Sequence, residues 1–413
     1  MYSRRKFLRT AAGSLVMAGG AALTGRAAFG TDYPGELGPK TLPSGTLDSS
    51  VLEALPGTLP LIKRAYRAPN FETPTSYFDE VITPNNVFFV RYQLSNIPEV
   101  NARDWRLSIG GDSAEKPFQL TFDELKRNFD PVEIVAVDQC SGNRRGLSDP
   151  HVAGVEWGYG AMGNAKWKGA RLRDILNKAG VKKDALEVVL DGADSGVIAK
   201  SPDFVKSLPM WKALDENTLI AYEMNGAPLP HWNGFPARLV APGWTGTYWM
   251  KHIISLNIVS QPFSGFWMKT AYRIPKGKFP VIDRFLSQEA EATAPITEMV
   301  VNSLITNLHT GQRFSAGQPL VVRGIAWDGG YGIRLVEVSV DEGMSWRPAE
   351  LGADYGRFSF RQWSYAFTPE RKGGVVVMAK ASNRAGATQT FELIFSPAGY
   401  HNNVIQRIGI EVT

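Results

Sequence analysis

The stretch that decides the fold is Val137-Asp138-Gln139-Cys140-Ser141-Gly142-Asn143-Arg144-Arg145. Apolar residues at 133–138 predict a strand, and the small, polar residues that follow predict a tight turn. The turn holds the single cysteine of the 413-residue chain, and two arginines come directly after it. Nearby positive charge favours the thiolate, the form of cysteine that binds metals or attacks electrophiles. The pattern favours a functional thiolate over a buried structural cysteine. A nucleophile of the Cys–His kind stays an alternative, because the sequence does not locate its histidine partner.

One cysteine excludes an intramolecular disulfide, a CxxCH haem attachment, a four-cysteine iron–sulfur site and a multi-cysteine zinc site. The five histidines show no HExxH spacing, which makes a histidine-rich metal site unlikely on this pattern. The glycine fingerprints GxGxxG and GxxxxGK[ST] are also absent. The usual nucleotide, haem and protein-only metal sites are therefore not expected.

Two further segments carry cations in unusual surroundings. Arg91 lies in an apolar and aromatic run at 87–94 that predicts a buried strand. A buried arginine needs an anion, which is either a ligand or a structural carboxylate such as Asp138. Arg238 and Lys251 lie on a segment rich in Gly, Pro and Trp. Cations on glycine-rich loops commonly hold a phosphate, although a solvated basic surface explains either residue singly.

The N-terminus reads as an export signal. Ser3-Arg4-Arg5-Lys6-Phe7-Leu8 is a twin-arginine signature, and the weakly hydrophobic stretch at 11–23 is too short to span a bilayer. Cleavage after residue 30 is expected, with an uncleaved anchor as the alternative. The twin-arginine route exports folded proteins that often carry a cofactor, so the signal predicts a periplasmic cofactor protein.

The net charge of +5 is located in this leader, which has five basic residues and no acid. Without it, 40 Lys and Arg face 40 Asp and Glu. A formally neutral chain gives no global electrostatic reason to bind nucleic acid.

The remaining chain divides into segments with different residue patterns. An extended arm is expected at 31–75, and a catalytic domain at 76–281 mixes short strands with amphipathic helices such as 172–178. Beyond a polar connector, residues 292–413 show short strand-like runs, among them 335–340 and 391–395, separated by turns. These runs predict an immunoglobulin-like sandwich. The expected class is α+β, with a mixed α/β domain followed by an all-β domain.

Five motifs in order resemble the sulfite oxidase family of molybdenum enzymes. They are the cysteine motif, FFxRxxL at 88–94, WxGARLxDxL at 167–176, YEMNGxPLP at 222–230 and GFPxR at 234–238. The resemblance covers about residues 75 to 410. It implies a molybdopterin-binding domain followed by an immunoglobulin-like dimerisation domain, with one molybdenum per chain and a homodimer.

The resemblance also implies roles for individual residues. Cys140 would be the one protein thiolate on molybdenum, and Arg91 and Arg145 would form an anion pocket completed by Trp157 and Tyr272. The predicted cofactor-binding residues are Phe89, Val90, Arg91, Tyr92, Gln93, Cys140, Asp194, Asn233, Arg238, Trp249, Met250 and Lys251.

Three departures from the family pattern make the predicted pocket less positive. Gln93 and Asn233 stand where histidines occur in other members, and the run at 399–403 lacks an arginine that animal members supply.

The predicted function is a periplasmic sulfite dehydrogenase that oxidises sulfite to sulfate. With no haem motif in the chain, electrons would pass to an external c-type cytochrome. One alternative is the molybdenum subunit of a sulfane-sulfur dehydrogenase, and a nitrate reductase is less favoured. From another class, the alternative is a metal-free β-sandwich binding protein. Neither nucleic-acid binding nor a membrane span is expected.

Overall fold

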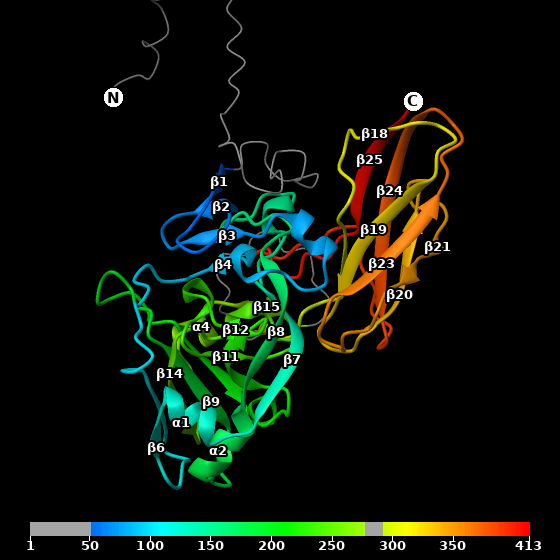
Figure 1. The fold of residues 1–413 in the computed structure, drawn as a ribbon. Coiled ribbons are helices and arrows are strands. Elements are labelled where there is room, and N and C mark those ends of the chain that lie inside the picture. Colours follow the sequence, from blue (N-terminus) through cyan, green and yellow to red (C-terminus); the bar gives the residue numbers. More distant parts are fainter. Residues whose placement is uncertain (1–50, 277–291) are drawn as a thin grey trace, which may run out of the picture.

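The computed structural model describes residues 51–276 and 292–413. The chain forms a mixed α/β region followed by a β-sandwich, as Figure 1 shows from blue to red. The expected export signal at 1–30 lies outside the described residues. No helix in the described part of the chain is long and apolar enough to cross a membrane.

A small antiparallel sheet begins the described chain. Its order is β1 (Val51–Glu53), β2 (Leu61–Ala65), β3 (Asn70–Glu72) and β4 (Val90–Arg91). The strand predicted at 87–94 is thus only two residues long, because a 3-10 turn at Asn85–Val87 follows Pro84 and shortens it. In β4, Arg91 pairs with Asn70 of β3.

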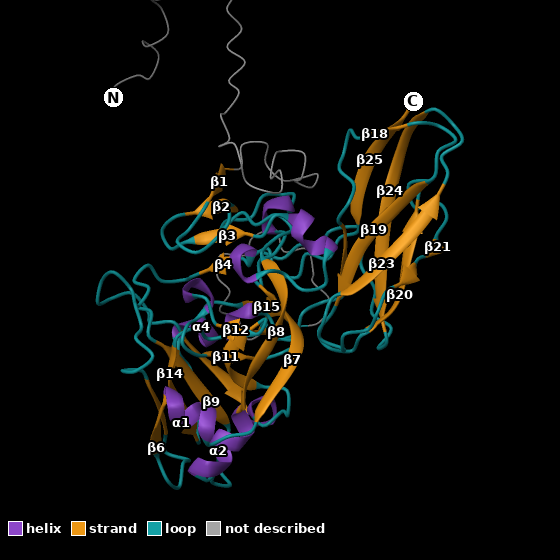
Figure 2. Ribbon diagram, viewed as in Figure 1, coloured by secondary structure: helices purple, strands orange, loops and turns teal. Residues whose placement is uncertain are grey.

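Two larger sheets form the body of the α/β region (Figure 2). The first has the order β10 (Val205–Pro209), β9 (Glu187–Gly192), β14 (Ile253–Val259), β5 (Arg106–Gly110) and β6 (Phe118–Thr121). The second has the order β12 (Ala227–Pro228), β11 (Leu219–Met224), β8 (Met162–Arg171) and β7 (Pro131–Gln139), with β13 (Arg238–Val240) also on β11. The long β7–β8 hairpin delivers the cysteine turn at its end.

Short helices cover the sheets. They are α1 (Phe122–Arg127), α2 (Leu172–Ala179), α3 (Met210–Ala213) and α4 (Phe266–Lys269). The α1 helix begins at a reciprocal capping box between Thr121 and Glu124. The α2 helix matches the one predicted at 172–178, because its apolar residues share one buried face and Gly180 ends it with a φ of +71°.

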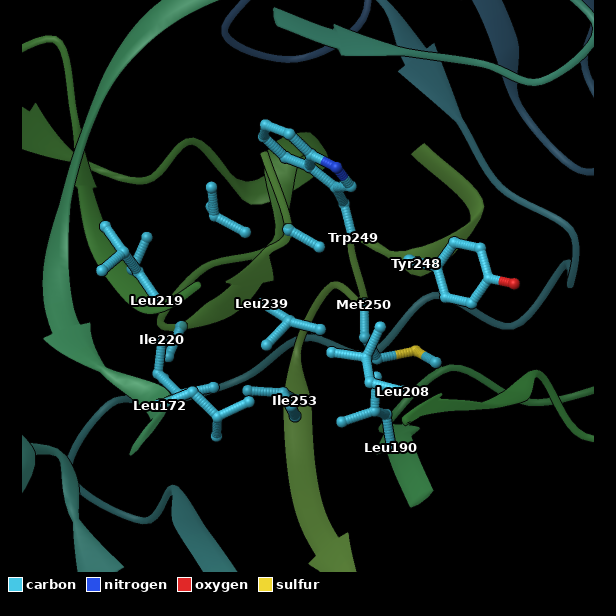
Figure 3. Close-up of a cluster of buried hydrophobic side chains, with 14 of the residues drawn as sticks. Leu172, Leu190, Leu208, Leu219, Ile220, Leu239, Tyr248, Trp249, Met250 and Ile253 are labelled. Atoms are coloured by element: carbon cyan, nitrogen blue, oxygen red, sulfur yellow. The ribbon is translucent and has the colours of Figure 1, made fainter. Parts of the chain in front are cut away.

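The core of the region supports the segment at 248–250. Figure 3 shows Leu172, Leu219, Ile220, Leu239 and Ile253 packed beneath this segment, all fully buried. Removing such side chains from water stabilises the fold by about 1.5–3 kcal/mol each. The loop that carries the segment is therefore held firmly where the cavity described below opens.

The β-sandwich follows a two-stranded antiparallel sheet of β15 (Arg273–Pro275) and β16 (Thr293–Pro295). One sheet has the order β17 (Asn302–Ile305), β19 (Leu320–Trp327), β23 (Arg361–Phe367) and β22 (Glu350–Leu351). The other has the order β18 (Arg313–Phe314), β25 (Gln406–Val412), β24 (Gly373–Asn383), β20 (Ile333–Ser339) and β21 (Arg347–Pro348). The predicted sandwich is present, but the strand expected at 391–395 is a partly exposed loop, since no neighbouring strand pairs with it.

The two regions share a small core of their own. It consists of Phe78, Val137, Tyr159, Met162, Met299, Leu304, Ile325, Trp327 and Phe360. The Trp327 indole donates to the Gln139 amide oxygen at 2.6 Å. Arg144 donates to the carbonyls of Ser303 and Val404 at 2.7 and 2.9 Å. The sandwich thus fixes the turn that carries the cysteine.

Candidate active site

Cys140 lies directly after β7 and is 6% exposed. Its amide donates to the Ala161 carbonyl across the hairpin, and its carbonyl accepts from the Asn143 amide at 3.0 Å. Gly142 leaves room for the Arg145 guanidinium, because a Cβ at this position would lie 2.4 Å from it and the guanidinium would have to move. The turn is thus a tightly packed platform for the thiol.

The thiol opens onto a cavity that is partly open to solvent. Eleven of the predicted site residues line this cavity: Phe89, Arg91, Gln93, Cys140, Asp194, Asn233, Arg238, Trp249, Met250, Lys251 and Tyr272. They come from five separate parts of the chain. The structure therefore brings together most of the set that the sequence motifs predicted.

An ion pair occupies one part of the wall. Arg238 donates to Asp138 at 2.8 Å, and both side chains are almost fully buried. Burial raises the pKa of Asp138, and the charge of Arg238 opposes that rise. Arg238 also donates to the carbonyls of Asn233 and Trp249. Asp138 thus serves Arg238 and not Arg91, the partner considered from the sequence.

Lys251 is the second cation of this part of the wall. Its ammonium donates to the Arg91 carbonyl at 2.6 Å and lies 4.2 Å over the Tyr92 ring. Burial, together with the charge of Arg238, lowers its pKa to about 8. Asp194 faces the same group, and burial raises its pKa while Lys251 opposes the rise. Arg238 and Lys251 thus face two carboxylates, Asp138 and Asp194, and the positive charge that suits an anionic ligand comes from Arg91 on the same wall.

Arg91, Gln93 and Tyr272 form a second polar group. Arg91 donates to Asn70 at 2.9 Å and to Tyr272 at 3.1 Å, and Gln93 also donates to the Tyr272 hydroxyl at 3.1 Å. Because the hydroxyl accepts twice, its own proton is available to donate elsewhere. No carboxylate pairs with Arg91 among the described residues. A partly buried arginine without a counterion, on the wall of a cavity, suits an anionic substrate.

Four predicted site residues do not line the cavity. Val90 and Tyr92 point to the other face of their strand and pack in a separate core, since side chains alternate along a strand. Trp157 is fully buried behind the turn. Arg145 donates to the carbonyls of Ala398 and Val155 at 2.8 and 3.0 Å.

The sandwich contributes Tyr400 at this point. Its ring stacks on Tyr272 with centroids 5.7 Å apart and planes 9° apart, and the Arg145 guanidinium lies 5.5 Å from it. Tyr400 therefore links Arg145 to the cavity wall. The sequence run at 399–403 drew attention only for an arginine it lacks, so nothing in the pattern singled out this tyrosine.

Other lining residues were not predicted as site residues. They are Asp138, Ser141, Phe204, Trp232, Gly246 and Thr247. Asp138 and Ser141 belong to the cysteine stretch and could have been found from it. Gly246 allows close approach, since a Cβ there would lie 2.5 Å from an Asp138 oxygen. Phe204 and Thr247 carry no motif and are found only from the fold.

Several buried polar atoms around the cavity have no hydrogen-bond partner in the described part of the protein. They are Arg91 Nε, Asp138 Oδ1, Ser141 Oγ, Arg238 Nε and Thr247 Oγ1. Buried polar atoms are nearly always satisfied, so unmet donors gathered at one cavity indicate a polar ligand. With a thiol, three basic side chains and these unmet polar atoms, the cavity fits an anionic cofactor that presents a metal to Cys140.

Comparisons with known proteins agree with this arrangement. A family model described as an oxidoreductase molybdopterin binding domain matches residues 94–267, and a Mo-co oxidoreductase dimerisation domain matches residues 293–413. Mitochondrial sulfite oxidase of Macaca fascicularis is 32% identical over 395 residues, covering 92% of this chain and 71% of that protein. The enzyme of Homo sapiens is 32% identical over 396 residues with the same coverage.

One solved structure matches nearly the whole chain. It is the sulfane dehydrogenase SoxCD from Paracoccus pantotrophus, with a TM-score of 0.72 and 24% identity, covering 95% of this chain and 98% of that chain. Together the matches confirm the predicted fold class and the predicted molybdopterin cofactor. The dimerisation-domain match supports the predicted homodimer.

Proposed function

This chain belongs to the sulfite oxidase family of molybdenum enzymes, and we propose that it is a periplasmic sulfite dehydrogenase that reduces an external c-type cytochrome. Membership makes it a molybdenum-dependent oxidoreductase acting on a sulfur group. It also excludes the metal-free binding protein considered from the sequence. The observation behind the choice of sulfite is Arg91, a cation without a carboxylate beside a hydroxyl free to donate.

The residues around the cavity fall into two sets, one that would hold the cofactor and one that would bind the substrate. Cys140 would be the protein's ligand to molybdenum, and Arg238, Lys251 and Asn233 would hold the anionic cofactor. When bound, the molybdenum cofactor supplies the two-electron oxidation and the oxygen atom that is added to sulfur.

Arg91 and Tyr272 would act on the substrate itself. The guanidinium would hold the oxygens of sulfite and of the sulfate product, and the Tyr272 hydroxyl would donate its remaining proton to one of them. Preorganised donors of this kind stabilise charge that builds on oxygen without reorganising during the reaction. Arg145, through Tyr400, stays a predicted contributor to the same anion pocket.

Molybdenum analysis of the purified protein and sulfite-dependent reduction of ferricyanide test the proposal. We expect about one molybdenum per chain and saturable sulfite oxidation. A loaded protein that oxidises a sulfane sulfur but not sulfite would favour the sulfane-sulfur dehydrogenase alternative. Reduction of a c-type cytochrome from the same periplasm, in place of ferricyanide, tests the acceptor.

Export is tested separately. Changing Arg4 and Arg5 to Lys should retain the protein in the cytoplasm, because the twin-arginine machinery requires the arginine pair. Normal periplasmic yield in a strain without that machinery would contradict the proposed location.

A further inference from the structure

Lys206 is a buried lysine directly behind the cavity wall. It lies on β10, and its side chain is completely inaccessible to solvent. Its ammonium donates to the Trp267 carbonyl at 2.7 Å and lies 4.5 Å from the Tyr248 ring centroid and 5.4 Å from that of Tyr272. The cation thus lies between the ring of Tyr272, which lines the cavity, and that of Tyr248, which is buried beside it (Figure 3 shows Tyr248).

Lys206 has no carboxylate partner within residues 51–276 and 292–413. Burial, together with the charge of Arg273, lowers its pKa to about 7. Lys212 offers a contrast on the next element, because this buried lysine lies 3.6 Å from Asp215 and donates to the Pro242 carbonyl. A buried ammonium without a counterion is costly for stability, so its presence beside the cavity asks for a functional reason.

The neighbours of Lys206 provide that reason. The Tyr272 ring faces the Lys206 ammonium, and the Tyr272 hydroxyl accepts hydrogen bonds from Arg91 and Gln93. Trp267, whose carbonyl Lys206 holds, has its ring 5.9 Å from that of Tyr272. Phe204, two residues before Lys206, lines the cavity itself. The Tyr272 ring therefore lies between the Lys206 ammonium and the place where the substrate anion would bind.

We propose that Lys206 is a positioning residue of the oxyanion site, which holds the segment at 267–272 against the cavity and adds its positive charge to that of Arg91. This inference rests on the proposed function, since it assigns Lys206 to the same anionic substrate. In the buried site the charge is poorly screened, so it strengthens anion binding although it does not touch the anion.

Binding of an anion and protonation of Lys206 then favour each other. Below pH about 7 the lysine is charged, and the affinity for a dianion is high; above it, the affinity falls. The groups that face Lys206 are the Tyr248 and Tyr272 rings and the charge of Arg273, whereas Asp191 and Glu187 of β9 pair with Val205 and Pro209 and lie on the opposite face of the sheet. A variant of Lys206 must therefore be compared with the wild type at each pH.

Inorganic sulfate is the probe of choice, because it is the reaction product and stays a dianion across the pH range, whereas sulfite itself titrates. Its inhibition constant is measured against sulfite at pH 6 and pH 9 for the wild type, Lys206→Met, Lys206→Arg and the control Lys212→Met. We expect Lys206→Met to weaken sulfate binding at pH 6 by roughly 3- to 10-fold and to flatten the pH dependence, by loss of one poorly screened charge. Lys206→Arg should bind tightly at both pH values, and Lys212→Met should behave like the wild type.

Thermal melting gives a second readout that does not depend on turnover. Lys206→Met should melt at or above the wild-type temperature at pH 6, and sulfate should raise its melting temperature less. Wild-type sulfate binding in Lys206→Met, or a pH-dependent inhibition constant in Lys206→Arg equal to that of the wild type, would overturn the inference. A wild-type enzyme that neither oxidises sulfite nor binds sulfate would instead overturn the proposed function.

Discussion

Two groups of cations line the same cavity and are held in different ways. In the first, which we call the Arg238 group, Arg238 is paired with Asp138, and Lys251 lies against the carbonyl of Arg91. In the second, the Arg91 group, Arg91, Gln93 and Tyr272 bond to one another and no carboxylate is present among the described residues. The comparison indicates that the first group is fixed by contacts within the protein, from where it would hold the cofactor, whereas the second leaves the charge of Arg91 without a counterion for the substrate.

Cys140 lies beside both groups, and its loss should have the largest effect. In Cys140→Ser, the protein should fold, but sulfite-dependent ferricyanide reduction should fall by at least about 1,000-fold, since an alkoxide is a harder and poorer ligand than a thiolate for this metal. Melting temperature and turnover are measured on the same preparation. Turnover close to wild type in the serine variant would show that Cys140 is not the molybdenum ligand.

Breaking the Arg238 group should mainly cost stability. Arg238→Met leaves Asp138 buried at 4% exposure without its partner, which should lower the free energy of unfolding by about 3–5 kcal/mol. Denaturant titration measures the change. Adding Asp138→Asn in the same chain is the control, because it removes the stranded charge and should restore part of the loss. A single variant as stable as the wild type would show that the pair is not structural.

The same substitution in the Arg91 group should have the reverse effect. Arg91→Met removes a charge that no carboxylate balances, so the melting temperature should hold or rise slightly. The value of kcat/KM for sulfite should fall by roughly 30- to 1,000-fold, because a charge-assisted contact to an oxyanion contributes about 2–4 kcal/mol. If instead the variant melts far below the wild type and its folded fraction keeps normal kcat/KM, Arg91 belongs to the scaffold.

The sequence predicted the fold class well because its signals are local. The β7 strand, the α2 helix and the alternating strands of the sandwich each follow from a short apolar pattern. The predictions of individual strands were wrong where a strand depends on contacts that its own residues do not reveal. The run at 391–395 is apolar enough for a strand but pairs with no strand, and the run at 87–94 is cut short by the turn that follows Pro84.

The site was predicted through motifs, and motifs do not report contacts. Arg91 was recognised as needing an anion, but only the fold shows that Asp138 is already bound to Arg238. Tyr400 and Lys206 carry no motif, since one reaches the cavity from another domain and the other lies behind its wall. Such roles come from long-range packing that no local pattern encodes.

The smallest expected effect concerns acid stability in the neighbourhood of the Arg238 group. His252 follows Lys251 and is fully buried, with Nδ1 donating to the Phe235 carbonyl and Nε2 accepting from the Tyr92 hydroxyl, each at 2.7 Å. Burial lowers its pKa to about 3, helped by the charge of Lys251, whereas an unfolded chain protonates this residue near its ordinary value of 6.5. Between these values the unfolded state binds a proton that the folded state does not, so stability is lost as the pH falls from about 6.5 towards 3. The loss should approach about 1 kcal/mol per pH unit.

Urea unfolding at pH 7, 6, 5 and 4 measures the slope. His252→Gln should be less stable at pH 7 but lose less with acid, and because Asp191 and other groups titrate in the same range, the difference between the two slopes is the test. Parallel slopes would mean that His252 does not stay neutral in the fold, and that the positive charge of this group is not confined to Arg238 and Lys251.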